Sequence, residues 1–389
     1  MRAAIAARVG RAQRGARRAR MLPGMRILYG VVGEGMGHAT RSRVLLEELT
    51  KEHEVHIVVS GRAQDYLAKR FQNVHGIWGL TLAYEGNSVK KWQTVLQNLT
   101  GAVKGWPQNI RQYFELVDGF RPDVVVSDFE SFSYMFARNH RLPVISVDNM
   151  QVINRCKHEP ALLAGHEDSF ETSRAIVKAK LPGAFHYLVT TFFYPELRKR
   201  RTTLAPSILR PEILEAKSEP GEHLLVYQTS TTNTALPDIL KAAGIPCRVY
   251  GLRRDITEDL VDGNLTYRPF SEKGFIDDLR TARGVVASGG FTLMSEAVYL
   301  RKPVLSVPLE GQFEQVINAL YLEQLGYGMY VKALTVDAVK EFLTRVPRCQ
   351  QALQGYEQDG NTRMLAALRE QLALAYEHRG HWAMERAQD

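Results

Sequence analysis

The chain has 389 residues, enough for two or three domains, and its 45% hydrophobic and 24% charged residues are ordinary for a globular enzyme. Seven of its 50 basic residues stand in residues 1–24, which hold no Asp or Glu; the rest of the chain carries 43 basic against 42 acidic side chains, so its charge gives no indication of nucleic-acid binding. Cys156, Cys247 and Cys349 are far apart, which argues against a disulfide framework or a cysteine metal site and fits the cytoplasm, and no apolar run reaches the about 20 residues of a membrane span.

Residues 1–24 form an Arg- and Ala-rich segment that ends in Pro23-Gly24. We interpret this segment as a basic, disordered leader or an upstream start, with Met25 opening the folded chain. A transit peptide and a basic arm that touches anionic lipid are the other interpretations of the same composition. The segment has no apolar stretch of the kind that a secretory signal contains.

Residues 25–206 alternate between strand and helix patterns. A buried strand is predicted at 26–32, followed by the glycine-rich loop 33–38 and a helix with an apolar face. Further strand patterns lie at 54–59, 124–127 and 144–147. Continuous Val/Ile runs between helices are typical of a parallel sheet that is buried on both faces, so we predict an α/β domain here.

A second alternating half follows a linker. The stretch 198–221 is rich in Pro and charge, and we place the linker itself at 207–221. The second α/β domain spans 222–360, with strand patterns at 223–227, 247–250, 285–287 and 304–307, and residues 361–389 are predicted to be a helix, at about 362–377, and a tail. Two such halves that face each other across a cleft place ligands at the carboxyl ends of both sheets.

The most informative motif runs from Ser288 to Glu296. An apolar run leads into Gly289-Gly290, and a helical pattern follows, so the motif predicts a strand, a tight turn and a helix start. Glycines let backbone N–H groups approach an anion, and a helix N-terminus adds partial positive charge. Thr292 adds a hydroxyl, and Glu296, about one turn later, suits a pair of sugar hydroxyls. The motif therefore predicts a pocket for a nucleotide diphosphate that carries a sugar.

The motif continues in an ordered series that resembles GT-B glycosyltransferases. The chain is most similar to the group that includes the bacterial muramyl-lipid N-acetylglucosaminyltransferase, UDP-glucuronosyl and plant UDP-sugar transferases and uncharacterised microbial relatives, from Met25 to about Tyr330. The matching residues, in order, are Gly289, Gly290, Glu296, Lys302, Pro303, Pro308, Glu314, Gln315, Asn318 and Ala319.

This resemblance implies the GT-B fold, two Rossmann-like domains whose parallel sheets face a central cleft. It implies an N-terminal acceptor domain, a C-terminal donor domain and a hexosyltransferase of class EC 2.4 that uses a nucleotide-diphosphate sugar, with UDP the expected nucleotide. Transfer is expected to invert the anomeric configuration and to need no metal and no cofactor, since helix dipoles, N–H groups and hydroxyls offset the charge of the leaving diphosphate.

In the first half the resemblance assigns His38 as the general base and Asp128 as the carboxylate that orients it. Imidazole suits a base because its pKa lies near neutrality. His38 could instead hydrogen-bond the glycine loop, and Asp128 could instead cap the helix after Ser131. Near the base, Gly33, Gly35 and Gly37 make room for the substrate, and Arg41 could meet a phosphate-bearing acceptor.

In the second half the resemblance assigns the donor-binding residues. Thr229 and Ser230 stand in a loop where relatives have glycines, and their hydroxyls are expected to reach the diphosphate. Phe270 is placed at the base, although on sequence grounds alone a core position is the more common one for Phe. The diphosphate is assigned to Gly289, Gly290 and Thr292, the ribose to Glu296, and the hydroxyls of the donor sugar to Glu314 and Gln315.

Three other functions share parts of this pattern. A sugar-nucleotide 2-epimerase has the same fold, and Asp148 and Glu130 are candidates for the carboxylates that its reaction needs. A dinucleotide oxidoreductase is suggested by the spacing of Gly33, Gly35 and Gly37, but Ser60-Gly61-Arg62 stands where an acidic residue is expected. A non-catalytic nucleotide-sugar-binding protein would keep the pocket and lose the base.

The acceptor has a weaker signal. Residues 90–106 carry Trp92, Trp106 and apolar residues at helical spacing, with three lysines. An amphipathic basic helix of this kind can lie on a membrane surface, so a lipid-linked acceptor and peripheral contact with the cytoplasmic face of a membrane form one hypothesis; an ordinary core-facing helix is the other and the more common origin of such a pattern. The sequence gives no indication of the oligomeric state.

Overall fold

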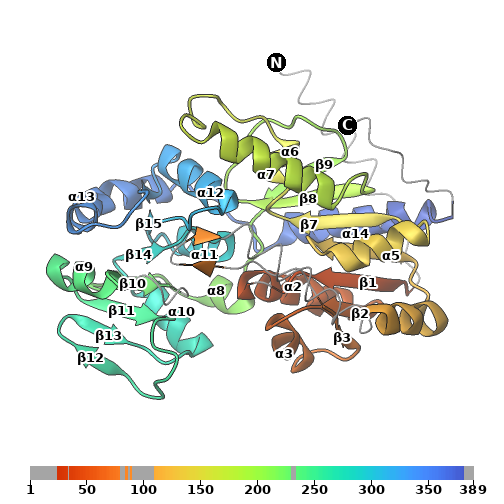
Figure 1. Cartoon of the computed structure of the whole chain (residues 1–389), viewed down its shortest axis with the longest axis horizontal. Coiled ribbons are helices and arrows are strands. Elements are labelled where there is room, and N and C mark those ends of the chain that lie inside the picture. The colour runs from red at the N-terminus through yellow and green to blue at the C-terminus, as the bar shows by residue number, and fades with distance from the viewer. Residues whose placement is uncertain are drawn as a thin grey trace.

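The computed structural model describes residues 24–33, 35–78, 84–85, 88–89, 109–228 and 234–380. Within these ranges the chain forms two seven-stranded sheets and a separate two-stranded ribbon, with helices on both faces of each large sheet (Figure 1). The first sheet belongs to the first half of the chain, and the second sheet begins after the linker. This architecture agrees with the two α/β halves that the alternating pattern predicts.

The strands are β1 (Arg26–Val31), β2 (Glu54–Val59), β3 (Val74–Gly76), β4 (Tyr84–Glu85), β5 (Ser88–Val89), β6 (Val124–Asp128), β7 (Val144–Asp148), β8 (His186–Thr191), β9 (Thr202–Pro206), β10 (Leu224–Tyr227), β11 (Cys247–Tyr250), β12 (Leu260–Asp262), β13 (Leu265–Tyr267), β14 (Gly284–Ala287), β15 (Val304–Ser306) and β16 (Gly328–Tyr330). The helices are α2 (Met36–Leu49), α3 (Ala63–Ala68), the π-helical turn η1 (Leu116–Phe120), α5 (Ser131–Asn139), α6 (Val152–Arg155), α7 (Glu167–Lys180), α8 (Pro211–Glu215), α9 (Leu236–Ala243), α10 (Glu272–Arg280), α11 (Phe291–Tyr299), α12 (Phe313–Gln324), α13 (Val336–Leu353) and α14 (Thr362–Glu377).

The first sheet is parallel throughout, in the order β3-β2-β1-β6-β7-β8-β9. Apart from Arg26 at the start of β1, the central strands β1, β6 and β7 are buried along their length, as expected for a parallel sheet with both faces covered. Strands β6 and β7 each run one residue further than their apolar patterns predict, so the strands themselves include Asp128 and Asp148.

The second sheet has the order β12-β13-β11-β10-β14-β15-β16 and is parallel except for the edge pair β12–β13. In both sheets the strand order reverses beside the first strand, between β1 and β6 and between β10 and β14. Ligands of open α/β sheets bind at such switch points, outside the carboxyl ends of the strands. Register places Asp128 beside Val31, and Ala287 beside Tyr227, so both predicted halves of the site start at a switch point.

Helix α14 returns to the first half of the molecule. Its apolar face, including Met364, Leu368 and Leu372, belongs to the same core cluster as Ile27 and Leu188 of the first sheet. The C-terminal helix that the leucine spacing predicts is therefore confirmed at Thr362–Glu377, and it covers the sheet from the other end of the sequence.

Two of the regions in which the halves meet differ in their chemistry. Next to α7, Phe193 stacks on Tyr321 with ring centroids 4.1 Å apart, and His158 Nδ1 lies 2.8 Å from the Tyr321 hydroxyl. Next to α2, Arg43 donates to Glu212 of α8 at 2.7 Å, and Arg70 lies 3.4 Å from Glu272 of α10. One contact region is thus aromatic and the other is built from ion pairs.

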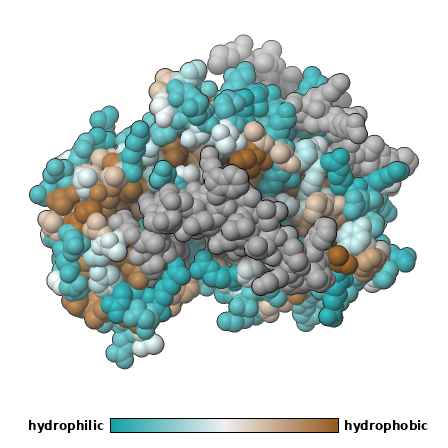
Figure 2. Space-filling view, in the orientation of Figure 1, coloured by the Kyte–Doolittle hydropathy of each residue, from teal (hydrophilic) through white to brown (hydrophobic). Residues whose placement is uncertain are grey.

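Figure 2 shows a mainly hydrophilic surface with separate hydrophobic patches, which is ordinary for a folded protein in water. Among the helices that the structure describes, none is both long enough and apolar enough to cross a membrane.

Candidate active site

His38 and Asp128 lie together at the switch point of the first sheet. His38 stands in the first turn of α2, directly after the glycine loop, and Asp128 is the last residue of β6. His38 Nδ1 lies 2.8 Å from Asp128 Oδ1. Asp128 is buried, whereas 20% of the His38 side chain is exposed, so the ring keeps one edge toward solvent.

Arg41 completes this cluster. Its Nε donates to Asp128 Oδ2 at 2.9 Å, its Nη2 contacts Oδ1, and Nη2 also lies 2.6 Å from His38 Nδ1. Ser42 donates to Asp128 Oδ2 at 2.9 Å. We expected Arg41 to meet an acceptor phosphate, but its guanidinium is buried against Asp128, one turn after His38 on the same helix, and so is not displayed toward an acceptor.

The charges in this cluster set the protonation states. Burial alone would raise the pKa of Asp128, but the charges of Arg41 and His38 and their hydrogen bonds hold the pKa of Asp128 well below its usual range. Burial, with the nearby Arg41 charge, lowers the pKa of His38. The pair is therefore an ionised carboxylate beside a neutral imidazole at neutral pH, which is the protonation state that a general base requires.

Asp128 does not cap the following helix. The N-cap of α5 is Glu130, whose carboxylate accepts from the backbone N–H groups of Phe132 and Ser133 at 2.6 and 2.7 Å. Between the two acids, Phe129 has φ of +55°, a left-handed conformation that is rare for a bulky residue and that clusters at functional sites. The turn directs the two carboxylates to different partners, and only that of Asp128 serves His38.

Two glycines of the first loop are required by close contacts. A side chain at Gly33 would collide with the Ser60 backbone, and one at Gly37 would meet Thr292 of α11. Thr292 donates from Oγ1 to the Gly37 backbone oxygen at 3.1 Å. This hydrogen bond joins the N-terminal ends of α2 and α11, so the His38 turn and the Gly289-Gly290 turn face each other across the two halves.

The Gly289-Gly290 turn has the predicted local structure. Gly289 has φ of +96°, Gly290 is the N-cap of α11, and a Cβ on Gly290 would meet no atom of the described residues within 4 Å. Asn318 braces the turn by donating to the Gly289 backbone oxygen at 3.3 Å. The turn thus leaves open space at a helix N-terminus, where backbone N–H groups and the helix dipole favour an anion.

Glu296 is buried and already has a cationic partner. Arg210, which stands in the linker directly before α8, donates from Nε and Nη2 to the two carboxylate oxygens at 2.7 and 2.9 Å. Arg210 also donates to Glu272 at 2.8 Å. A ribose at this position would have to share Glu296 with Arg210 or displace it.

Glu314, at the start of α12, lies within electrostatic reach of the His38–Asp128–Arg41 cluster. Burial raises the pKa of Glu314 to about 7, and Arg41, Asp148 and Asp128 are all close enough to act on its charge. Asp148 ends β7 and is fully buried, and burial raises its pKa to about 6. The predicted contact with the donor sugar therefore lies next to the predicted base.

Gln315 serves the neighbouring loop. Its Oε1 accepts from the Leu309 N–H at 2.9 Å, and its Nε2 donates to Gln312 at 2.8 Å. The side chain is buried, so the structure gives Gln315 a bracing contact in addition to the expected contact with the sugar.

Phe270 is not part of the core, because 78% of the residue is exposed just before α10. That exposure leaves its ring available for stacking. Thr229 and Ser230 lie outside the described residues, as do most of residues 79–108, including the Trp92–Trp106 segment from which we expected a membrane contact.

The sequence did not indicate that Arg210 and Ser42 belong to the site. It placed Arg41 at the acceptor, whereas the structure places Arg41 against Asp128. Each acts through a partner 86 or 87 residues away in the chain, and no short motif marks such a contact. Across the residues that the structure describes, no group of three or more His, Cys, Asp or Glu side chains is arranged to hold a metal ion.

Comparisons with known proteins agree with this arrangement. The sequence profile of the family described as Glycosyl transferase family 1 matches residues 25–347. An uncharacterized glycosyltransferase of Methanosarcina mazei is 25% identical over 354 residues, covering 81% of this chain and 88% of that protein, and one of Methanosarcina acetivorans is 24% identical over 353 residues with the same coverage.

Solved structures show the same fold. The glycotransferase of kitacinnamycin matches with a TM-score of 0.64 at 16% identity, over 90% of this chain and 100% of that one. MurG of Acinetobacter baumannii matches with a TM-score of 0.53 at 15% identity, over 89% and 99% of the two chains. The UGT2 of Phytolacca americana, solved with UDP-2fluoro-glucose and pterostilbene, matches with a TM-score of 0.60 at 12% identity, over 91% and 99%.

The match spans most of the folded chain, from the strand before the His38 loop to the end of the second sheet and into α13. With the two facing α/β halves, it shows that this protein belongs to Glycosyl transferase family 1 and is a glycosyltransferase of the GT-B fold.

Proposed function

We propose that the protein transfers a sugar from a nucleotide-diphosphate donor, with UDP as the nucleotide, to an acceptor hydroxyl, with inversion and without a metal ion. The observation that carries the proposal is the His38–Asp128 pair, 2.8 Å apart, which lies opposite the open Gly289-Gly290 turn. One half thus supplies a base and the other supplies an anion site at a helix N-terminus.

The reaction needs one proton transfer and one displacement. When Nδ1–H of His38 donates to Asp128, the Nε2 lone pair can take the proton of the acceptor hydroxyl. The acceptor oxygen then bonds to the anomeric carbon as the bond from that carbon to the diphosphate oxygen breaks, and the nucleotide diphosphate leaves. Asp128 stabilises the imidazolium that forms, and a single displacement inverts the anomeric centre.

Arg41 has a positioning role in this scheme. Because its guanidinium holds both oxygens of Asp128, the carboxylate cannot rotate away from His38. Its positive charge, 2.6 Å from Nδ1, also disfavours the imidazolium before reaction and so keeps the base neutral.

The donor is assigned to the second half. The N-terminus of α11, with Gly289 and Gly290, takes the diphosphate, and Thr229, Ser230 and Thr292 add hydroxyls; Phe270 stacks on the base, and Glu314 and Gln315 bind hydroxyls of the sugar. Glu296 takes the ribose hydroxyls after Arg210 moves aside. No metal is needed because N–H groups and the helix dipole offset the leaving charge.

The epimerase alternative finds less support. It needs free acidic groups in the cleft, but Glu130 caps α5, and Asp148 accepts from Ser146 at 2.6 Å and from the Gln151 N–H at 2.8 Å. A lipid-linked acceptor and contact with the cytoplasmic face of a membrane remain part of the proposal only through the composition of residues 90–106.

The test is a nucleotide-release assay on the full chain with EDTA present. UDP-, dTDP- and GDP-sugars are each incubated with pooled lipid-linked and small-molecule acceptors, and the anomeric configuration of the product is read by NMR. We expect UDP release that depends on an acceptor and an inverted product. Interconversion of UDP-N-acetylglucosamine with its 2-epimer without an acceptor would show the epimerase instead, and a strict metal requirement or a retained configuration would overturn the mechanism.

A further inference from the structure

A groove opens on the first half of the molecule, built from elements that carry none of the proposed catalytic or donor-binding residues. Two adjoining cavities, of about 380 and 290 Å³, share Asn154, Ala175, Lys178 and Lys199 as lining residues. These residues come from α6, α7 and the segment before β9. We refer to the two cavities together as the α7 groove.

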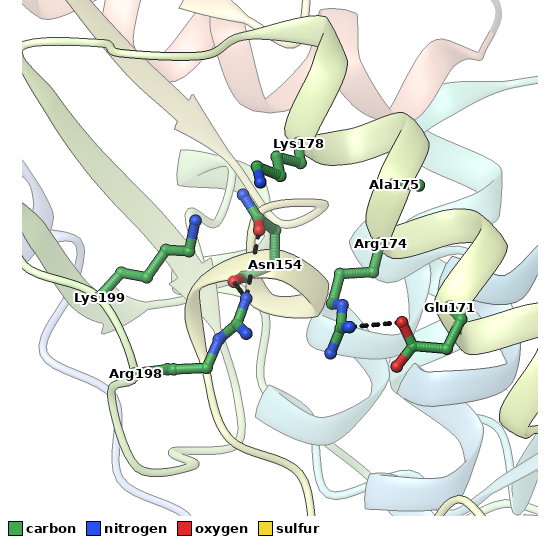
Figure 3. Close-up of a pocket in the computed structure, with 7 residues that line it drawn as sticks. All are labelled: Asn154, Glu171, Arg174, Ala175, Lys178, Arg198 and Lys199. Carbon is green, nitrogen blue, oxygen red and sulfur yellow. Dashed lines mark hydrogen bonds and ion pairs between the residues drawn. The ribbon is translucent and has the colours of Figure 1, made fainter. Parts of the chain in front are cut away.

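Cationic side chains converge in the α7 groove. In Figure 3, Lys178 of α7 and Arg198 of the segment before β9 reach toward Asn154, and Lys199 lies beside them, while Arg174 is turned toward Glu171, with which it forms an ion pair. Arg198 donates to the Asn154 backbone oxygen at 2.7 Å, and no carboxylate among the described residues pairs with its charge. Within the described part of the chain, Lys178 has neither an ion pair nor a hydrogen bond. Lys178 and Arg198 therefore each bring a positive charge to the groove that no described acidic side chain neutralises.

The surroundings reinforce this positive charge. Arg198 begins the run Arg198-Lys199-Arg200-Arg201, and the nearby Glu196 is paired with Lys157 at 2.5 Å. Burial, with a smaller contribution from the charge of Arg198, lowers the pKa of His158 to about 4. Burial lowers the pKa of His186 to about 4 as well, with Arg155 and Arg201 acting in the same direction. The positive charges around the groove thus contribute to the lowered pKa values of two nearby histidines.

One arm of the groove is apolar. The smaller cavity is lined by Ala179, Pro182 and Tyr187 in addition to the shared residues. Two aliphatic side chains next to the lining in sequence are exposed, Ile176 by 60% and Leu197 by 41%. The groove therefore combines cationic side chains, two of which line both cavities, with an apolar surface on the side of the smaller cavity.

We propose that the α7 groove is a binding site for a phosphate group, supplied either as free diphosphate or as the headgroup of an anionic lipid. Arg and Lys are the side chains that bind phosphate best, the former through a planar fork of N–H donors and the latter as a compact charge. The site is separate from the anion site proposed at α11 and involves none of its residues.

The test uses the full chain, so the basic residues 1–24 contribute equally to every sample. Pyrophosphate is one probe, and vesicles of phosphatidylglycerol in phosphatidylcholine are the other, with pure phosphatidylcholine as the blank. Binding is read by calorimetry or co-sedimentation, and acetylation of individual lysines, followed by mass spectrometry, gives a local readout. Lys178→Glu is compared with Lys340→Glu, an equal change of charge at another exposed helix lysine, on α13.

We expect at least one probe to protect Lys178 but not Lys340 from acetylation, and Lys178→Glu to weaken its binding about fivefold or more. Protection by pyrophosphate identifies free phosphate as the source, and protection by the anionic vesicles alone identifies the lipid headgroup. Lack of protection by both probes, or equal weakening by Lys178→Glu and Lys340→Glu, would overturn the proposal.

Discussion

The two halves of the site differ in how their polar groups are occupied. In the first half, His38, Arg41 and Asp128 contact one another, and the only exposed edge belongs to the imidazole. In the second half, Glu296 is bound by Arg210, and Gln315 is bound by the loop before α12. The proposed base is therefore in place before a substrate arrives, whereas the proposed donor residues must exchange partners when the nucleotide binds.

The largest expected effect tests the first half. His38→Ala should lower kcat/KM by about 10²- to 10⁴-fold, because it removes the group that takes the acceptor proton. UDP release with the identified acceptor measures the loss. Binding of UDP should be unchanged, since the nucleotide is held by the other half.

His140→Ala is the matched control, because His140 is an exposed histidine at the end of α5. It should keep kcat/KM within about twofold. A loss of less than fivefold in His38→Ala would contradict the assignment of the base.

The second-largest effect is expected at Glu296, the carboxylate of the second half that is bound by Arg210. Glu296→Ala should lower the free energy of unfolding by about 3 kcal/mol, because it leaves the buried Arg210 with only Glu272. Urea unfolding measures the change. Glu323→Ala, which breaks an exposed pair with Arg345, should cost no more than about 1 kcal/mol.

The double variant Glu296→Ala/Arg210→Met sharpens this result. Removing both charges should recover most of the lost stability, since no buried charge is then unpaired. If the double variant unfolds as readily as Glu296→Ala, the loss comes from packing and the ion pair is not its cause.

A smaller effect is expected when Glu314 is replaced, and here the free energy of unfolding should rise instead of fall. Its pKa is raised to about 7 in the folded chain, so the folded state holds this proton more tightly than the unfolded state does, and stability falls as pH rises from about 4.5 to 7. Glu314→Gln should therefore raise the free energy of unfolding at pH 8 by about 1–2 kcal/mol, after allowance for solvent screening, and leave it nearly unchanged at pH 4.

Urea unfolding at the two pH values measures this difference. The same substitution should weaken use of the donor if Glu314 binds the sugar. If Glu314→Gln changes the free energy of unfolding by the same amount at pH 4 and at pH 8, the raised pKa of Glu314 is contradicted.

The smallest effect is expected at Phe270. Its ring is exposed, so Phe270→Ala should not reduce stability by more than about 0.5 kcal/mol. Loss of stacking on the base should raise the dissociation constant for UDP by about three- to tenfold, and calorimetry measures it. An unchanged dissociation constant would remove Phe270 from the donor site.

Local patterns predicted much of the fold, and the resemblance predicted the site. Alternating apolar runs located the central strands, and the glycines at 289 and 290 predicted the turn before α11, because these signals depend on neighbours in the chain. The position of α14 on the first sheet depends on packing between distant segments, and leucine spacing predicts the helix but not its partner.

The same limit applies to side chains in the site. An Arg one turn after His38 is compatible with an exposed helix face, and only the approach of β6 makes it a partner of Asp128. Arg210 stands in the linker between the two halves, and it pairs with Glu296 because the folded chain packs this part of the linker against α11. Contacts of this kind have no signature in residue spacing.

Calorimetric titration of UDP in EDTA tests the central claim, that donor and base lie on opposite halves, most directly. Wild type, His38→Ala and the near-isosteric Glu296→Gln are compared after circular dichroism has confirmed that each is folded. The account predicts that wild type and His38→Ala bind UDP with similar dissociation constants, and that Glu296→Gln binds at least tenfold more weakly. Absence of UDP binding to wild type, or a loss in His38→Ala as large as that in Glu296→Gln, would contradict it.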